Sequence, residues 1–138
     1  MMIGRRNTTA TWGALGAALL ACVAAAATAP YDFTGHWTGM SQETGKAALS
    51  LTADLTSQAG TKHFNGTMGV ADDPPLTCDV TGREKRNLKV KMRIACSGVV
   101  IRLHGTLDPA TQTVTGGYVR PGRHKRHVGT FTLTRQPS

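Results

Sequence analysis

The sequence predicts an all-β fold, an eight-stranded antiparallel up-and-down β-barrel, with a β-sandwich as the alternative. Three observations predict it. Beyond Pro30, apolar residues recur at every second position in short runs, Gly, Asp, Pro and Asn separate the runs, and no helical period lies between them. Closing such a meander into a barrel removes its two exposed edges. The interior of an eight-stranded barrel is either filled by side chains or holds one small ligand.

The alternation defines eight strands in chain order. The fifth is the clearest, because Lys89, Lys91 and Arg93 occupy every second position between apolar residues. The eight runs lie at 33–39, 47–55, 64–70, 76–82, 88–96, 99–107, 114–118 and 131–133.

Two cysteines fall on the apolar faces of neighbouring strands. A turn near residues 86–87 would set Cys78 opposite Cys96, so we expect a disulfide in an oxidising compartment. Such a bridge closes a loop of about 19 residues and contributes ~3 kcal/mol in the loop-entropy account. A slip of either strand by one residue would turn one sulfur outward, so the disulfide and the strand assignment support each other.

Residues 1–27 are predicted to be a signal peptide that is removed, which leaves 28–138 as a single β-barrel domain. A basic start, an apolar centre and the small residues Ala25-Ala26-Ala27 follow one another in the order that export requires. The apolar centre is shorter than the ~20 residues that span a bilayer. Two variants remain open: a twin-arginine signal, and a lipoprotein with its lipid on Cys22. All three kinds of export signal predict a periplasmic or secreted bacterial protein.

Gly35-His36-Trp37, at the start of the first strand, resembles the Gly-x-Trp signature of the calycin group, the lipocalins and avidins. Segment 129–134 is similar to the last strand of an avidin-type barrel. The resemblance implies that Trp37 packs across the closed end of the barrel. Avidins stack biotin on several tryptophans, whereas residues 28–138 contain one, so biotin binding is not expected. The size, compartment and disulfide also resemble those of small secreted bacterial metalloprotease inhibitors.

Catalytic chemistry is not expected. The inner face of the predicted barrel contains no carboxylate and no histidine, whereas Asp72, Asp73 and Asp108 lie in turns, where Asp is favoured for backbone reasons. The histidines of 124–127 are separated by cations, which favours solvent exposure over metal binding. We therefore expect no enzyme activity, no cofactor and no metal.

Charge is distributed unevenly along the chain, whose formal net charge is +8. Residues 28–82 carry two Lys against six carboxylates, a net of −4, and 83–138 carry twelve Lys and Arg against two carboxylates, a net of +10. The basic half predicts a surface for an anion or a partner. Aromatic residues among these cations are too few for base stacking, so no nucleic acid is expected. The candidate residues are Lys85, Arg86, Lys89, Lys91, Arg93, Arg120, Arg123, Lys125 and Arg126.

Two functions remain open. The first is an exported, non-enzymatic barrel that binds a small apolar or amphipathic ligand in its lumen. The second is an envelope module or protease-inhibitor-like protein that acts through its basic surface on an anionic or protein partner. Inner-face glycines either leave space for a ligand or bend the strands: Gly35, Gly66, Gly82, Gly105 and Gly116. The residues expected to line the lumen are Trp37, Phe64, Met68, Met92, Tyr118 and Phe131.

Overall fold

The computed structural model describes residues 29–122 and 125–138. The predicted signal peptide, with Cys22, and Arg123 lie outside the described residues. Within these residues, eight strands and one short 3-10 turn, η1, make up the fold. They are β1 (Gly35–Glu43), β2 (Leu49–Ser57), β3 (His63–Val70), β4 (Leu76–Glu84), η1 (Arg86–Leu88), β5 (Lys89–Cys96), β6 (Val99–Asp108), β7 (Thr113–Arg120) and β8 (His127–Arg135).

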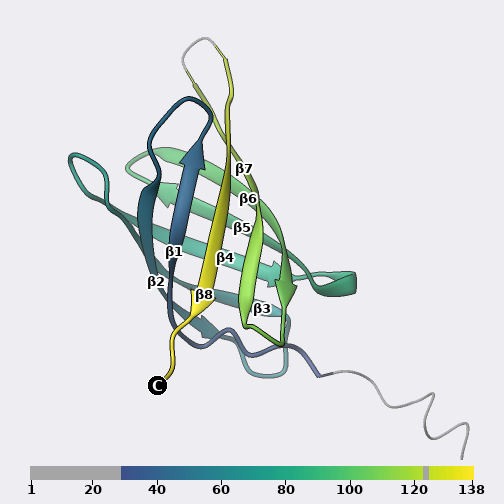
Figure 1. Ribbon diagram of the computed structural model, residues 1–138. Helices are drawn as coiled ribbons and strands as arrows, with labels where there is room; N and C mark the ends of the chain where they lie inside the picture. The colour runs from purple at the N-terminus through teal and green to yellow at the C-terminus, as the bar shows by residue number, and fades with distance from the viewer. Residues whose placement is uncertain (1–28, 123–124) are drawn as a thin grey trace, which may run out of the picture.

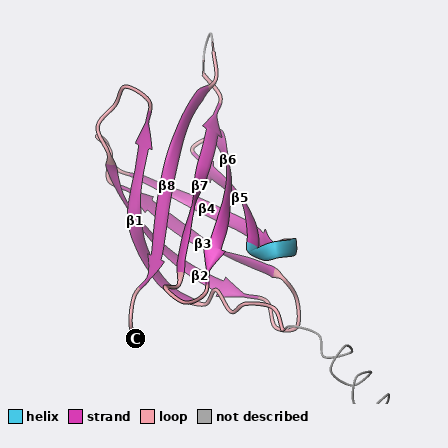
Figure 2. Cartoon of the chain, turned by 45° about the vertical axis from the view of Figure 1, so that its right-hand side comes forward, coloured by secondary structure: helices cyan, strands magenta, loops and turns pink. Residues whose placement is uncertain are grey.

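The strands form a closed antiparallel barrel, as Figure 1 shows. Each strand pairs with the next, and β8 closes the barrel by pairing with β1 in a register that sets Gly39 opposite Leu133. The predicted up-and-down barrel is confirmed, and the sandwich alternative is excluded. Figure 2 shows η1 as the single cyan segment among the strands and loops that it colours. No helix in the described part of the chain has the length and apolar character needed to cross a membrane.

The connections divide the barrel into two ends. Odd-numbered strands run toward the loops 44–48, 71–75 and 97–98 and toward residues 121–122 and 125–126, which surround one end, called here the open end. The other connections, including η1, surround the opposite end together with segment 29–34, and this end is called the closed end (Figure 1).

The predicted disulfide is confirmed. Strand β4 pairs with β5 so that Asp79 faces Ala95, and the next residues in that register are Cys78 and Cys96. Their Cα atoms lie 4.4 Å apart and their sulfurs are bonded. Residues 86–88 form the turn between the two strands, where the sequence predicted it.

Segment 29–34 closes one end of the barrel. Phe33 stacks on Phe64 with ring centroids 4.3 Å apart and on Trp37 at 6.0 Å. The Trp37 indole is 0% exposed, and its Nε1–H donates to the Phe33 carbonyl at 2.9 Å. The segment is held from two sides, because the Phe33 N–H donates to Ser57 Oγ and the Tyr31 N–H to Glu84 Oε1. Trp37 thus lies at the closed end, as the calycin resemblance implied.

Arg135 packs against the same aromatic groups from β8. Its guanidinium carbon lies 5.2 Å from the Tyr31 ring centroid and 5.3 Å from that of Trp37, within the range of a cation–π interaction. Its Nε and Nη2 atoms are buried without a hydrogen-bond partner among the described residues, so the rings are their main contacts.

The first strand begins later than the sequence predicted. Phe33 belongs to the closing segment, and β1 starts at Gly35, whose φ of +142° strains any residue with a Cβ. This glycine lets the chain change direction between the closing segment and the barrel wall.

Candidate functional site

A cavity of about 590 Å³ occupies the open half of the barrel. All eight strands contribute to its wall. Its deeper part is apolar and includes Leu51, Met68, Leu103 and Phe131, all of them buried. The remaining lining residues are Ser41, Glu43, Lys46, Ala47, Leu49, Val70, Asp72, Leu76, Ile94, Cys96, Ser97, Val99, Ile101, Tyr118 and Arg120.

The distribution of side-chain size explains why one half is hollow. Aromatic residues Phe33, Trp37 and Phe64 fill the closed half. The inner positions near the open end hold smaller aliphatic residues, such as Val70 and Ile101, which do not meet across the barrel. No described segment inserts into this end as 29–34 does into the other.

The residues that we predicted to line the lumen separate into two groups of three. Met68, Tyr118 and Phe131 border the cavity. Trp37, Phe64 and Met92 are buried in the packed core and do not line the cavity. The sequence showed that all six face inward, but not at which end they lie.

Glycines do not create the cavity. A Cβ on Gly82 would lie 2.4 Å from Phe64 Cζ, so the space at this glycine is filled by that ring. A Cβ on Gly66 or Gly116 would collide with the backbone of the neighbouring strand at about 2 Å. These glycines therefore permit close strand approach and packing, and the space for a ligand that the sequence suggested at them is not found there.

Glu43 is the buried charge at the rim of the cavity, and the prediction of an inner face without a carboxylate is wrong. Its side chain follows the inward parity of Trp37 on β1, and the residue is 8% exposed. Arg120 Nη2 lies 2.8 Å from Oε1 and 3.1 Å from Oε2, and Arg120 Nε lies 3.0 Å from Oε1. Lys46 Nζ lies 2.9 Å from Oε2, and His127 Nδ1 lies 3.4 Å from it.

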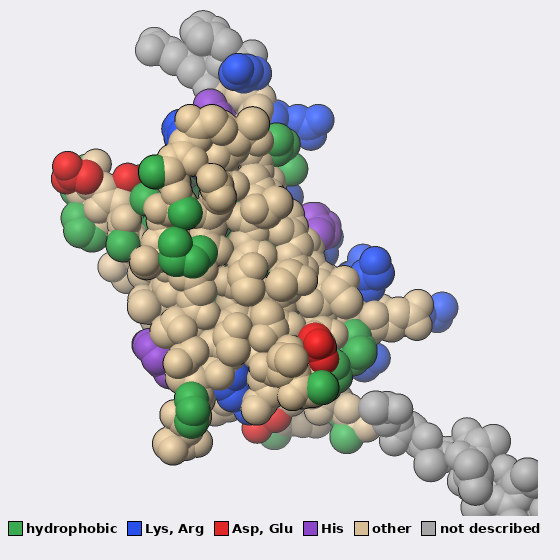
Figure 3. Space-filling view, viewed as in Figure 1, with side chains coloured by type: hydrophobic (Ala, Val, Ile, Leu, Met, Phe, Trp, Pro, Cys, Tyr) green, Lys and Arg blue, Asp and Glu red, His purple; other side chains and the backbone are tan. Residues whose placement is uncertain are grey.

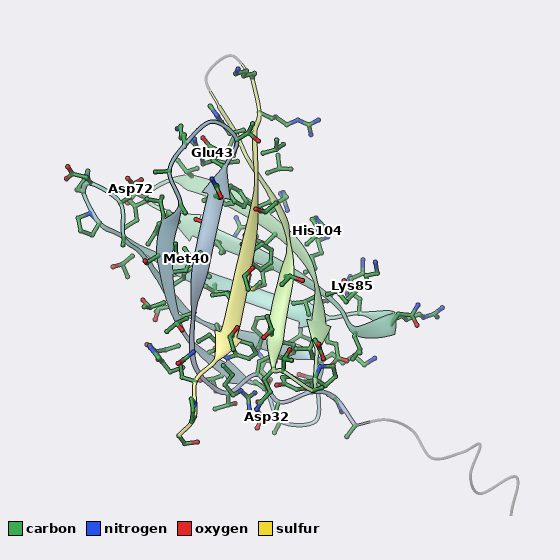
Figure 4. The ribbon with its side chains drawn as sticks, viewed as in Figure 1. Asp32, Met40, Glu43, Asp72, Lys85 and His104 are labelled. Carbon is green, nitrogen blue, oxygen red and sulfur yellow. A yellow bond between two sulfur atoms is a disulfide. The ribbon has the colours of Figure 1, made fainter. Side chains whose placement is uncertain are left out.

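This group, the Glu43 cluster, joins β1 to three other parts of the open end. Lys46 links β1 to the following loop. Arg120 links β1 to the end of β7, and His127 links it to the start of β8. Figure 4 places Glu43 near the upper end of β1. Arg120 and His127 also follow inward parity, so the inner face contains a histidine too, and Arg120 is not part of an outward basic surface.

The electrostatics of the cluster favour the ionised carboxylate. Burial on its own would raise the pKa of Glu43, but hydrogen bonds and positive charge from Lys46 and Arg120 outweigh it, and the pKa lies below its usual value. Tyr118 lies nearby on the cavity wall, where burial and then the Glu43 charge raise the pKa of its phenol, against a smaller lowering by Arg120. The phenol thus remains a neutral hydrogen-bonding group at the mouth.

Three of the remaining predicted basic residues lie on the outer surface of the barrel wall. On β5 the outward positions are Lys89, Lys91 and Arg93, and β6 places Arg102 opposite Arg93 and His104 opposite Lys91. Lys and Arg side chains gather along the right-hand edge in Figure 3, where Figure 4 labels His104 and Lys85. We call this surface the basic wall; its residues are Arg83, Lys89, Lys91, Arg93, Arg102 and His104.

The other predicted cations lie at the two ends of the barrel. Lys85 and Arg86 are exposed in the β4–β5 turn beside the basic wall, at the closed end. Lys125 and Arg126 are exposed in the β7–β8 loop at the open end. The predicted basic residues therefore form two separate clusters, one made of the basic wall and the β4–β5 turn and the other in the β7–β8 loop.

Comparison with known proteins gives the fold and no family. The chain matches no family model and no curated protein. Among solved structures it is similar to "Structure of EF1p2_mFAP2b bound to DFHBI", with a TM-score of 0.63 and 13% sequence identity over 75% of this chain and 93% of that chain. At this identity the likeness establishes the fold, an eight-stranded barrel consistent with the calycin resemblance.

Proposed function

We propose that the protein is an exported, non-catalytic binding protein that holds a small apolar or amphipathic molecule in the open half of its barrel. The cavity of about 590 Å³ carries this proposal. Ligand pockets typically enclose ~300–1,000 Å³ and combine apolar walls with a few polar groups. The similar chain EF1p2_mFAP2b was solved bound to DFHBI, which supports a small molecule as the ligand.

The lining indicates how such a ligand would lie. Its apolar part would contact Met68, Leu103 and Phe131 in the depth of the cavity. A polar end would face the Tyr118 phenol and the Glu43 cluster at the mouth. This arrangement favours an amphipathic molecule that enters with its apolar part first.

Two observations support the remaining parts of the proposal. The Glu43 carboxylate is held by Arg120 and Lys46, so these charges position one another rather than a reacting group. The Cys78–Cys96 disulfide is of a kind that persists outside reducing compartments, which agrees with export by the predicted signal peptide.

Titration with the apolar fluorophore N-phenyl-1-naphthylamine tests the proposal. Wild-type protein should bind it saturably, with an increase in emission. The variant Leu49→Trp/Ile101→Trp places two indoles in the cavity wall and should weaken binding by about tenfold or more, since ~1.4 kcal/mol of lost contact corresponds to that factor.

The matched control is Ser50→Trp/Val100→Trp, which places the same indoles on the neighbouring outward positions of the same two strands. It should bind like the wild type. Equal affinities for the cavity variant and the wild type would exclude this cavity as the binding site.

A further inference from the structure

The basic wall brings like charges directly opposite one another. Arg83 on β4 faces Lys91 on β5, which in turn faces His104 on β6. One row further along, Arg93 faces Arg102. Directly opposed side chains of an antiparallel pair have Cβ atoms about 4.5–5.5 Å apart, and like charges at that separation destabilise the sheet.

No carboxylate within the described residues forms an ion pair with these side chains. The ion pairs of the described chain join His36 to Asp54, and Lys46, Arg120 and His127 to Glu43. The opposed charges of the basic wall are therefore not paired with a carboxylate in the described chain.

A hollow of about 440 Å³ lies where the basic wall meets the β4–β5 turn. Lys62, Arg83, Lys85, Arg86 and Lys89 line it, together with His104. The one carboxylate in its lining is Glu84, which already accepts the hydrogen bond from the Tyr31 N–H. The hollow thus concentrates positive charge on a concave surface.

The same turn exposes an apolar side chain. Leu88 is 38% exposed between Arg86 and Lys89, and its φ of 61° is in the left-handed region, as is that of Asn87 at 57°. A bulky residue rarely adopts this backbone conformation, because its Cβ is crowded there. Leu88 therefore has a strained backbone conformation although its side chain is not buried.

We propose that the basic wall and the β4–β5 turn dock on an anionic lipid bilayer, with the cations at the phosphate headgroups and Leu88 entering the boundary of the acyl region. Opposed like charges and a left-handed leucine backbone each oppose folding, and they lie together with apolar surface that Leu88 leaves in water. An anionic bilayer would neutralise the opposed charges and take up the apolar side chain that the turn holds in water.

Leu88 is the feature that selects this partner among polyanions. A nucleic acid or an acidic polysaccharide would neutralise the cations but would leave the leucine in water. None of the residues that form the wall and the described turn is Trp, Tyr or Phe, the types on which bases stack.

The docking surface is independent of the proposed ligand cavity. Residues 85–89 lie at the closed end and Arg93 and Arg102 near the middle of the wall, whereas the mouth of the cavity is at the open end. Loss of vesicle binding therefore leaves the binding of N-phenyl-1-naphthylamine intact, and the two proposals can fail separately.

Vesicle sedimentation of the full chain tests the docking. The measured quantity is the ratio of its affinity for vesicles of mixed phosphatidylglycerol and phosphatidylcholine to that for pure phosphatidylcholine. The affinity for neutral vesicles measures the binding that comes from apolar segments elsewhere in the chain, and the ratio corrects for it. We expect Lys91→Gln/Arg93→Gln to lower the ratio by about 25-fold, since each charge near an anionic surface contributes about fivefold. The wild-type ratio should also fall between about 0.1 M and 1 M salt.

Lys125→Gln/Arg126→Gln is the matched control, because it removes the same charge from the other basic cluster, and it should keep the wild-type ratio. An equal loss in both variants would show that net charge alone acts and would overturn the proposal. Leu88→Ser should lower binding to the anionic vesicles about threefold or more, as expected when a leucine loses partial burial. An unchanged affinity for Leu88→Ser, or full competition by inorganic phosphate, would assign the surface to a soluble anion and equally overturn it.

Discussion

The two halves of the barrel differ in what fills them, although the same eight strands and the same alternation build both. In the closed half, aromatic rings from β1, β3 and segment 29–34 interlock, and the Trp37 indole is completely buried. In the open half, apolar side chains and a polar rim surround a cavity of about 590 Å³. The alternation thus decides which residues face inward, while side-chain volume and a closing segment decide whether the interior is packed.

The stabilising interactions differ between the halves in the same way. Aromatic packing stabilises the closed half. At the open end the strand ends are joined by the Glu43 cluster, a polar group that fixes the rim without filling the interior. A ligand site needs this combination, because its frame must be ordered while its centre stays free.

Trp37→Ala should cause the largest loss of stability. Removal of a fully buried indole from a core costs about 3–5 kcal/mol, because its contacts are lost and a cavity remains. Urea unfolding followed by circular dichroism measures the change. A loss below about 1 kcal/mol would mean that the closed half is not the stable part of the barrel.

Removal of the disulfide should cause the second-largest loss of stability. The variant Cys78→Ala/Cys96→Ala should lose about 3 kcal/mol, since the unfolded chain regains the entropy of the closed loop. Reduction of the wild-type protein should lower its unfolding midpoint in the same direction. A midpoint that does not respond to reductant would argue against the bridge in the native protein.

Glu43→Gln should lower the stability by about 2 kcal/mol at neutral pH, because it leaves the partly buried Arg120 without its counter-charge. The folded-state pKa of Glu43 is depressed, so the stabilisation by its carboxylate is present above the unfolded pKa of about 4.3 and is lost as the pH falls through the folded value. The difference from wild type should therefore shrink as acid is added. A difference that stays constant between pH 5 and pH 3 would contradict this ion pairing.

Ile101→Ala should have the smallest effect, about 1 kcal/mol or less, because the side chain borders a cavity and is only partly buried. The same urea experiment compares it with Trp37→Ala. A loss as large as that of the indole would show that the open half is packed and not hollow.

The sequence predicted the barrel and the disulfide because both depend on alternation within short segments. Cys78 and Cys96 could be set opposite one another from strand parity and one turn, without knowledge of the rest of the fold. The outward positions of Lys89, Lys91 and Arg93 followed from the same parity. These features require only local patterns, which a sequence displays directly.

The location of the cavity could not be predicted in this way. It depends on which end segment 29–34 closes and on whether side chains from opposite strands meet, which are properties of the assembled barrel. Trp37 and Phe64 were therefore placed in the lumen with Met68, although they pack in the closed half.

The Glu43 cluster was missed for a more specific reason. The first predicted strand ended at Gly39, although Ser41 and Glu43 continue its inward parity. A charged residue at that position indicates the end of a strand, unless its ion-pair partner is known. That partner, Arg120, lies 77 residues away in the sequence. We predicted it for a basic binding surface, although it shares the inward parity of Tyr118.

Methyl NMR during titration with N-phenyl-1-naphthylamine tests the central claim, that the open half of the barrel is the ligand site. Signals from Leu49, Val70 and Ile101 should shift with a common dissociation constant, while those of Leu55 and Leu107 in the packed core stay in place. Shifts confined to the core or to outward-facing methyl groups, or no shifts under saturating probe, would contradict it.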